Sequence, residues 1–238
     1  MQALGTILGV WAHPDDETYL TAGLMAAAVR GGRRVVCVTA TRGEEGSWDE
    51  DRWPTESLGM VREKELEASL RILGVTEHHW LDHHDGTLAD VPLEDGAGRI
   101  AGFIEEVRPD SVFTFGPEGM TDHPDHKAVH AWTTEAFRRA APAGATLYYA
   151  AVTQEWSDRW KPLLDRFNVF YSPDTPPVRA HGDLAILWEL PPDLLDLKYE
   201  AIQAHVSQME GFNKAFGPDF LRDSNATEAF YVAERKAR

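Results

Sequence analysis

The sequence predicts an α/β protein with a Rossmann-like, mostly parallel sheet flanked by helices and a C-terminal elaboration. Short apolar runs rich in β-branched residues alternate with longer segments of helical periodicity. Connections of that length favour right-handed βαβ units and therefore parallel strands. No internal repeat or long linker interrupts the pattern. We therefore expect a single domain over residues 1–238, with an α/β core over about 1–152 and the elaboration over about 153–238.

The elements of the core are predicted from apolar runs and from the residues that end them. Thr6–Ala12 is an almost uninterrupted apolar run, which predicts a buried strand, and a helix from about Glu17 to Arg30 ends at Gly31-Gly32. The same criteria predict the remaining core elements in this order: strand Arg34–Thr41, helix Ser57–Leu73, strand His79–Asp82, helix Asp95–Val107, strand Ser111–Gly116, helix Asp125–Ala140 and strand Thr146–Val152.

The last third of the chain is less regular. Three prolines mark a loop, because proline removes a backbone donor and fixes φ: Pro173, Pro176 and Pro177. Beyond it we expect a strand at Asp183–Glu189, one long amphipathic helix over Asp193–Met209 and a closing strand at Phe230–Val232.

Composition excludes several classes of function. The 238 residues hold 23 Lys and Arg against 39 Asp and Glu, a formal charge of −16. Binding to nucleic acid or to an anionic membrane needs clustered basic residues, so we expect neither partner. Cys37 is the only cysteine and permits no intrachain disulfide and no cysteine-based zinc cluster. With no basic leader and no apolar stretch of membrane length, we expect a cytoplasmic protein.

Imidazoles and carboxylates follow the predicted strands at their carboxyl ends, where open α/β sheets bind ligands. The four segments are His13-Pro14-Asp15-Asp16-Glu17, Thr41-Arg42-Gly43-Glu44-Glu45-Gly46, Asp82-His83-His84-Asp85-Gly86 and Asp122-His123-Pro124-Asp125-His126. The first turn lacks the glycine-rich phosphate cradle of a dinucleotide site. Its consecutive carboxylates would repel a pyrophosphate and suit a divalent cation.

His13 and Asp16 are three residues apart at the start of a helix, so both side chains can point the same way. With one histidine of the second His-Pro-Asp motif they would form a ligand set of two histidines and one carboxylate, which fits Zn²⁺ or Fe²⁺. Spacing does not choose between His123 and His126. Asp15 would lie beside metal-bound water, where a general base belongs. The alternative is a helix N-cap made by Asp15 or Asp16, with a chance histidine before it.

These motifs resemble the PIG-L/LmbE family of zinc-dependent N-acetylglucosaminyl deacetylases. The resemblance rests on HPDDE after the first strand, TRGEEG after the second and HPDH after the fourth. Supporting similarity lies in Val61–Leu66 through Leu73–Val75, in Leu81-Asp82 through Asp85-Gly86, and in Ala204–Gln208. It covers most of the chain to about residue 130 and becomes weaker beyond it.

The resemblance implies a role for each matching residue. The zinc ligands would be His13, Asp16 and His126. Asp15 would be the base, His123 would stabilise the oxyanion, and Asp125 would orient a histidine. The proton for the leaving amine would come from either His123 or Asp15, and the sequence leaves this choice open. Arg62 would hold the acyl or sugar end and Asp85 would contact sugar hydroxyls. Some members carry a tyrosine two residues before the first histidine of HPDH, where this chain has Thr121, so such a contribution would have to come from elsewhere.

Several features also have structural explanations. Arg62 lies among Glu63, Glu65 and Glu67, so ion pairs on a solvated helix would account for it. The histidine tract is expected mainly at the pocket rim or the surface: His78, His79, His83 and His84. Trp48 and Trp53, in the acidic loop Arg42–Glu56, would either cover a sugar ring or fold back on the core. His205 and Gln208 would pack rather than reach the site.

The sequence thus predicts a metal-dependent hydrolase that removes an acetyl group from an N-acetylated amino sugar or its conjugate. The alternatives are a metallohydrolase of another amide or ester and a non-catalytic metal-binding protein. The partner would be a small-molecule substrate whose aglycone stays open: inositol, malate, an oligosaccharide or an antibiotic scaffold. A homo-oligomer also stays open, because C-terminal elaborations often carry subunit contacts.

Overall fold

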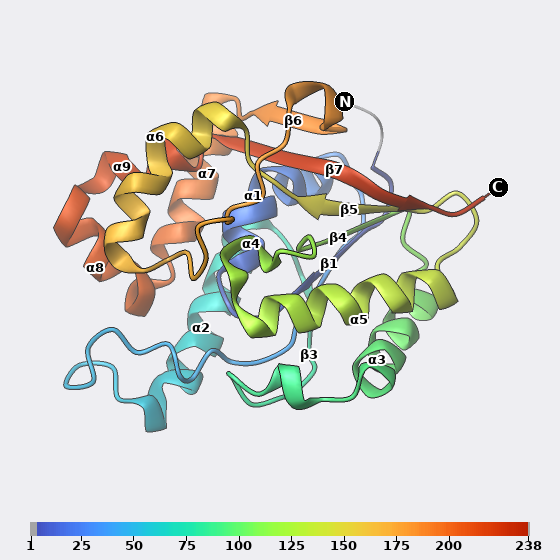
Figure 1. Cartoon of the computed structure of the whole chain (residues 1–238), viewed down its shortest axis with the longest axis horizontal. Coiled ribbons are helices and arrows are strands. Elements are labelled where there is room, and N and C mark those ends of the chain that lie inside the picture. Colours follow the sequence, from blue (N-terminus) through green and yellow to red (C-terminus); the bar gives the residue numbers. More distant parts are fainter. Residues whose placement is uncertain (1–3, 238) are drawn as a thin grey trace.

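Seven strands form one sheet in the order β3-β2-β1-β4-β5-β7-β6 in the computed structural model, which describes residues 4–237 (Figure 1). The first five strands of that order pair in parallel, and β7 and β6 join antiparallel. The strands are β1 (Ile7–Trp11), β2 (Val35–Thr39), β3 (Glu77–Trp80), β4 (Ser111–Thr114), β5 (Thr146–Ala150), β6 (Ile186–Glu189) and β7 (Thr227–Arg235). The predicted α/β class with a mostly parallel sheet is confirmed.

Helices cover both faces of this sheet, which is why β1, β2, β4 and β5 are buried throughout. On one face α1 (Asp16–Arg30), α2 (Thr55–Leu73) and α7 (Pro192–Gln203) pack together. On the other, α3 (Leu93–Val107) packs against α5 (Pro124–Ala140). Cys37 is buried in β2 as expected, and burial raises the pKa of its thiol well above its ordinary value.

The order of the strands determines where a ligand can bind. β1 pairs with β2 on one side and with β4 on the other, so the connections from β1 and β4 leave for opposite faces. A crevice opens at such a switch point, outside the carboxyl ends of the strands. The short helix α4 (Gly119–Asp122) and the start of α5 follow β4 there, facing the start of α1.

The C-terminal third differs most from expectation. The prediction of one helix over Asp193–Met209 is wrong, because α7 ends at Gln203 and α8 (Val206–Phe216) begins after a break at His205. His205 has ψ of 59°, and the carboxylate of Glu65 on α2 accepts hydrogen bonds from the Ser207 backbone N–H and Oγ, both at 2.7 Å. A remote side chain therefore caps a new helix where the local sequence contains no breaker.

Further elements of this region had no sequence prediction: α6 (Gln154–Leu164), α9 (Pro218–Ser224) and the 3₁₀ turns Asp165–Phe167 and His181–Asp183. The 3₁₀ turn Leu88–Asp90, in the core between β3 and α3, was not predicted either. β7 is longer than the predicted closing strand, and with β6 it extends the sheet of the core. A second apolar cluster, built on Ile202, Met209, Phe212, Phe220 and Leu221, holds these helices together. Within residues 4–237 no helix combines the length and apolarity that crossing a membrane requires.

Candidate functional site

A cavity of about 770 Å³ opens at the carboxyl edge of the sheet, where the segments after β1, β2, β3 and β4 meet. The sequence-predicted residues that line it are His13, Asp15, Asp16, Arg62, Asp85, His123 and His126. Asp125 lies behind them and is completely buried. Side chains from distant parts of the chain therefore converge as the topology requires.

His13, Asp16 and His126 bring three donor atoms together. His13 Nδ1 lies 3.1 Å from His126 Nε2. The carboxylate of Asp16 approaches both rings, with Oδ2 3.8 Å from His13 Nδ1 and Oδ1 3.5 Å from His126 Nε2. Asp16 Oδ2 also accepts a 2.8 Å hydrogen bond from the backbone N–H of His13, which fixes the carboxylate. The N-cap alternative finds no support, because Asp15 at the N-cap makes no side-chain capping bond.

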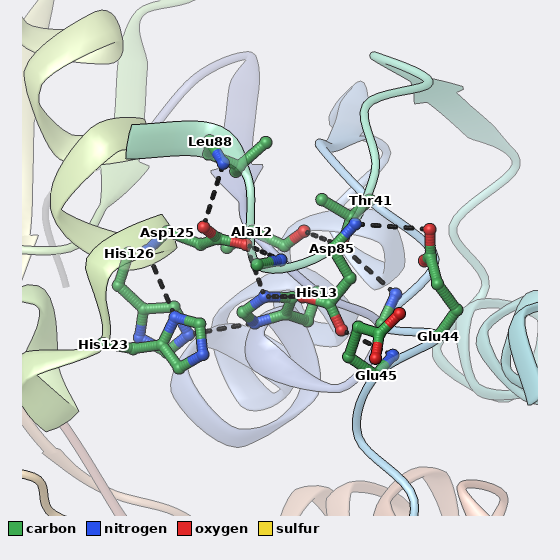
Figure 2. Close-up of polar contacts among 12 residues, drawn as sticks. Ala12, His13, Thr41, Glu44, Glu45, Asp85, Leu88, His123, Asp125 and His126 are labelled. Carbon is green, nitrogen blue, oxygen red and sulfur yellow. Dashed lines mark hydrogen bonds and ion pairs between the residues drawn. The ribbon is translucent and has the colours of Figure 1, made fainter. Parts of the chain in front are cut away.

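The outer partners of the two imidazoles determine which ring nitrogens carry protons. His126 Nδ1 lies 2.8 Å from the carbonyl oxygen of Gly119, so it donates and leaves Nε2 bare. His13 Nε2 lies 2.9 Å from Asp85 Oδ1 and 3.4 Å from Asp125 Oδ2, so it donates outward and Nδ1 faces inward (Figure 2). In the neutral rings two lone pairs then face each other at 3.1 Å. A cation between the two nitrogens would bind both lone pairs and so remove this repulsion. Two imidazole nitrogens and one carboxylate are a donor set that fits a divalent metal ion.

The charges around His13 favour a cation in the same place. Burial disfavours its charged form, but hydrogen bonds to Asp125 and Asp85 outweigh burial and raise the pKa of His13 to about 10. Burial also raises the pKa of Asp16 to about 7, against the attraction of His13. The buried carboxylates thus stabilise a proton on His13, and a bound metal ion would replace that proton.

Asp125 and Asp85 support the ligand-like residues from behind. Asp125 accepts hydrogen bonds from the backbone N–H groups of Gly86 at 2.8 Å and Leu88 at 3.1 Å, which aim its carboxylate at His13. Asp85 accepts one from the Glu45 N–H at 3.0 Å. Expected at sugar hydroxyls, Asp85 lines the cavity but has His13 as its main partner. The contact of Asp125 with Leu88 and that of Asp85 with Glu45 appear in Figure 2.

Asp15 stands at the edge of the donor set in an unusual conformation. It is a non-glycine residue with φ of 106°, and its Oδ2 lies 3.1 Å from Arg62 Nη2. Arg62 is buried, and its guanidinium also donates to the carbonyl oxygens of Gly43 at 2.8 Å and Pro14 at 2.5 Å. Arg62 therefore ties the segments after β1 and β2 together around Asp15. Burial raises the pKa of Asp15, and Arg62 opposes that increase.

His123 lies on the opposite side of the donor set. Its Nδ1 accepts a 3.1 Å hydrogen bond from the backbone N–H of Asp125 and so caps α5, which leaves the ring proton on Nε2. Burial and the nearby His13 lower the pKa of His123, so it is a neutral donor. Donor atoms of His13, His123 and His126 lie within 4.8 Å of one another. The third histidine of this segment, His130, faces the Phe115 carbonyl oxygen instead, at 3.0 Å.

Two residues near the site have no counterpart in the sequence predictions. Glu17 is completely buried, and its Oε2 accepts a 3.1 Å hydrogen bond from the Asp15 N–H. Its position directly after the His-Pro-Asp-Asp turn is a signal that could have indicated it. Tyr171 lies with its ring centre 5.4 Å from that of His123, and its N–H donates to the Thr121 carbonyl oxygen at 2.9 Å. No local pattern indicates that contact.

The remaining sequence candidates are the histidine tract, Trp48 and His205, and of these Trp48 lines the cavity. Of the described residues that line it, none belongs to the histidine tract of β3 and the following loop. Trp48 lines the cavity and also donates through Nε1 to Gln208 Oε1 at 3.0 Å, so the acidic loop does contact α8. His205 is buried and packs, with Nε2 3.3 Å from Thr18 Oγ1 and 3.7 Å from Glu17 Oε1.

Comparisons with known proteins identify the family of this chain. Residues 8–137 match the family described as GlcNAc-PI de-N-acetylase, PIG-L. A 1D-myo-inositol 2-acetamido-2-deoxy-alpha-D-glucopyranoside deacetylase of Mycobacterium sp. (strain KMS) is 31% identical over 236 residues, covering 85% of this chain and 74% of the relative.

Solved structures share the fold at low identity. The N,N'-diacetylchitobiose deacetylase of Pyrococcus horikoshii aligns with a TM-score of 0.69 at 21% identity, over 95% of this chain and 83% of that one. GalB of Pseudomonas putida KT2440, a 4-carboxy-2-hydroxymuconate hydratase, aligns with a TM-score of 0.65 at 16% identity, over 98% of each chain. The fold alone therefore does not fix the reaction, whereas the sequence match does fix the family: this chain belongs to the PIG-L family of GlcNAc-PI de-N-acetylases.

Proposed function

We propose that this protein is a metal-dependent N-deacetylase that removes the acetyl group from an N-acetylglucosamine-type sugar conjugate, releasing acetate and a free amine. Family membership and the deacetylase activity named for the mycobacterial relative support the reaction. The observation that carries it is the convergence of His13 Nδ1 and His126 Nε2 at 3.1 Å beside Asp16, with Asp15 at the edge of the set. We also propose one catalytic domain, since β6 and β7 complete the sheet of the core.

His13, Asp16 and His126 would hold the metal ion, for which we propose Zn²⁺, with Fe²⁺ as the alternative that the same donors accept. A divalent cation held there would lower the pKa of a water molecule toward neutrality and would provide positive charge for the carbonyl oxygen. Asp125 and Asp85 would keep the Nε2 proton of His13 outward and its Nδ1 lone pair inward. These carboxylates would therefore act by orienting His13 as a metal ligand.

Asp15 would accept the proton of the attacking water. Its ion pair with Arg62 orients the carboxylate and favours its ionised form, while the hydrogen bond from its own N–H to Glu17 fixes the backbone. A general base must be held within hydrogen-bond reach of the proton that it takes, and both contacts restrict Asp15 in that way. Proton transfer of this kind contributes about 10²–10⁴-fold to the rate.

His123 would serve the other side of the amide. Its Nε2–H would donate a hydrogen bond toward the oxygen that becomes negative during attack. Because the neutral ring carries only that proton, the proton for the departing amine would come from Asp15, which has taken it from the attacking water. Arg62 and Asp85 remain our proposed substrate contacts, since both line the cavity and Arg62 has donors left after its three observed bonds.

Metal analysis joined to an assay for free amine tests this function. We expect one metal ion per chain and amine release from N-acetylglucosamine conjugates that requires that ion. Acetate and amine must appear in equal amounts. Metal-loaded protein that releases no amine from any conjugate would leave the alternatives, a hydrolase of another amide or ester or a non-catalytic metal-binding protein.

A further inference from the structure

The cavity extends well beyond the polar residues of the catalytic end. Its volume of about 770 Å³ is in the upper part of the range of about 300–1,000 Å³ that accommodates drug-sized ligands, so one amino sugar leaves much of it free. The far end runs below α6 and reaches α8, α9 and the start of β7. These elements lie at one end of the molecule (Figure 1). The unused part of the cavity thus belongs to the C-terminal elaboration.

Apolar side chains line this far end. They come from several elements: Trp156, Trp160, Phe170, Met209 and Phe212. None of the residues of α6 is fully buried, although the side of this helix that carries Trp160 and Leu164 packs against the second apolar cluster. Trp156, Trp160 and Leu164 of the same helix also line the cavity. An apolar surface that lines a cavity gains free energy when an apolar ligand removes it from water.

The polar groups of the far end are already used within the protein. Trp156 Nε1 donates to the Ser224 carbonyl oxygen at 2.7 Å, and Asn225 Nδ2 donates to that of Leu221 at 2.9 Å. Glu228 is buried in an ion pair with Lys198 at 2.9 Å. The charged residues that also line this end are exposed and stay hydrated: Glu155, Arg159, Glu189 and Asp223. A polyol placed against the Trp156, Asn225 and Glu228 side chains would lose hydration without gaining matched partners there.

We propose that the substrate carries an apolar aglycone, an aromatic ring system or an acyl chain, which binds between α6 and α8 while the N-acetylated sugar occupies the polar end. The proposal rests on the deacetylase function above and specifies its substrate class. It distinguishes this chain from the mycobacterial relative, whose name specifies an inositol conjugate. Because the apolar wall is continuous with the catalytic end, one glycoside can occupy both.

Matched glycosides test the proposal on the metal-loaded full-length protein. The substrates are free N-acetylglucosamine and its myo-inositol, octyl and phenyl glycosides of one anomeric configuration, compared by kcat/KM from amine release. We expect the better of the octyl and phenyl glycosides to exceed the inositol conjugate by about tenfold or more. The octyl and phenyl arms distinguish a chain from a ring. Turnover of the inositol conjugate equal to or above both apolar glycosides would overturn the apolar aglycone and leave the deacetylase function intact. No turnover of any substrate would overturn both.

A variant locates the effect in the cavity. Trp160→Ala should lower the ratio of kcat/KM for the preferred apolar glycoside to kcat/KM for free N-acetylglucosamine by about tenfold, and Trp160→Phe should restore part of it. Trp188→Ala on β6, outside the cavity, is the matched control and should leave the ratio unchanged. An unchanged ratio in Trp160→Ala would count against the proposed wall. The wild-type comparison decides the substrate class even if the variant fails to fold.

Discussion

Glu17 holds the backbone of Asp15: its Oε2 accepts the Asp15 N–H at 3.1 Å while Asp15 adopts φ of 106°. A non-glycine residue in such a conformation carries strain of about 1–3 kcal/mol and persists only when its surroundings impose it. Because α1 starts at the next residue, this strained turn directs the Asp15 side chain into the cavity, away from the helix it precedes.

We therefore expect Glu17→Ala to lower kcat by about 10²-fold with little change in KM, since a small displacement of a catalytic group has a cost of that order. Glu17→Gln should lose less, because its amide oxygen still accepts the bond. The measurement is steady-state amine release together with metal content, which should stay at the wild-type level in both variants. Equal activity of Glu17→Ala and wild type would refute the positioning role.

Asp15→Asn separates proton transfer from metal binding. The amide keeps the shape of the side chain but cannot accept the proton, so kcat should fall by about 10²–10⁴-fold while the metal stays bound. Asp122→Asn, on the neighbouring short helix and outside the cavity, is the control and should retain activity. Near-normal turnover of metal-loaded Asp15→Asn would make the general-base assignment wrong.

His126→Ala should abolish stoichiometric metal binding, because it removes one of two inward-facing imidazole nitrogens. His130 lies on the same helix about one turn further and contacts the Phe115 carbonyl oxygen. The His130→Ala variant should therefore keep the metal. Elemental analysis after dialysis against buffer reads out both variants. If His126→Ala still retained one ion per chain, the proposed ligand set would fail.

Metal affinity should increase with pH. Burial opposes the charged ring, but Asp125 and Asp85 raise the pKa of His13 to about 10, so near neutral pH the metal-free protein holds a proton that the ion must displace. The apparent affinity should therefore rise by up to about tenfold per pH unit for each proton released, and level off above pH 10. Calorimetry at pH 7 and 8 in two buffers of different ionisation enthalpy measures the release. An affinity independent of pH would contradict it.

The ion pair between Lys198 and Glu228 is fully buried, at 2.9 Å, and Glu228 also accepts the N–H groups of Gly23 and Leu24 on α1. Lys198→Met leaves that carboxylate buried without its cation, so unfolding free energy should fall by about 3–5 kcal/mol. Adding Glu228→Gln should recover part of the loss. Denaturant unfolding measures both. Arg30→Ala, which breaks an exposed pair with Asp193, is the control and should change stability little.

How far the sequence predicts this site can be judged residue by residue. The carboxyl-edge rule and the two His-Pro-Asp motifs were sufficient to bring His13, Asp16 and one histidine of the second motif together, and only the family resemblance pointed to His126. Spacing could not choose between His123 and His126, because the choice depends on backbone partners: the Gly119 carbonyl oxygen binds His126 Nδ1, and the Asp125 N–H occupies His123 Nδ1. The contact of Asp85 with His13 was not predicted, because it depends on the Glu45 N–H, which fixes the Asp85 carboxylate from a different segment.

By itself the sequence determined the alternation of strands and helices, the parallel core and the four polar segments at its carboxyl edge, since hydrophobic periodicity and turn residues are local signals. Only the tertiary structure decided the break at His205, which Glu65 imposes from α2, and the large apolar cavity below α6. Both arise from contacts between residues far apart in the chain. Their free energy depends on burial and capping that no local pattern encodes, and that is why the metal end of the site was predictable and the substrate end was not.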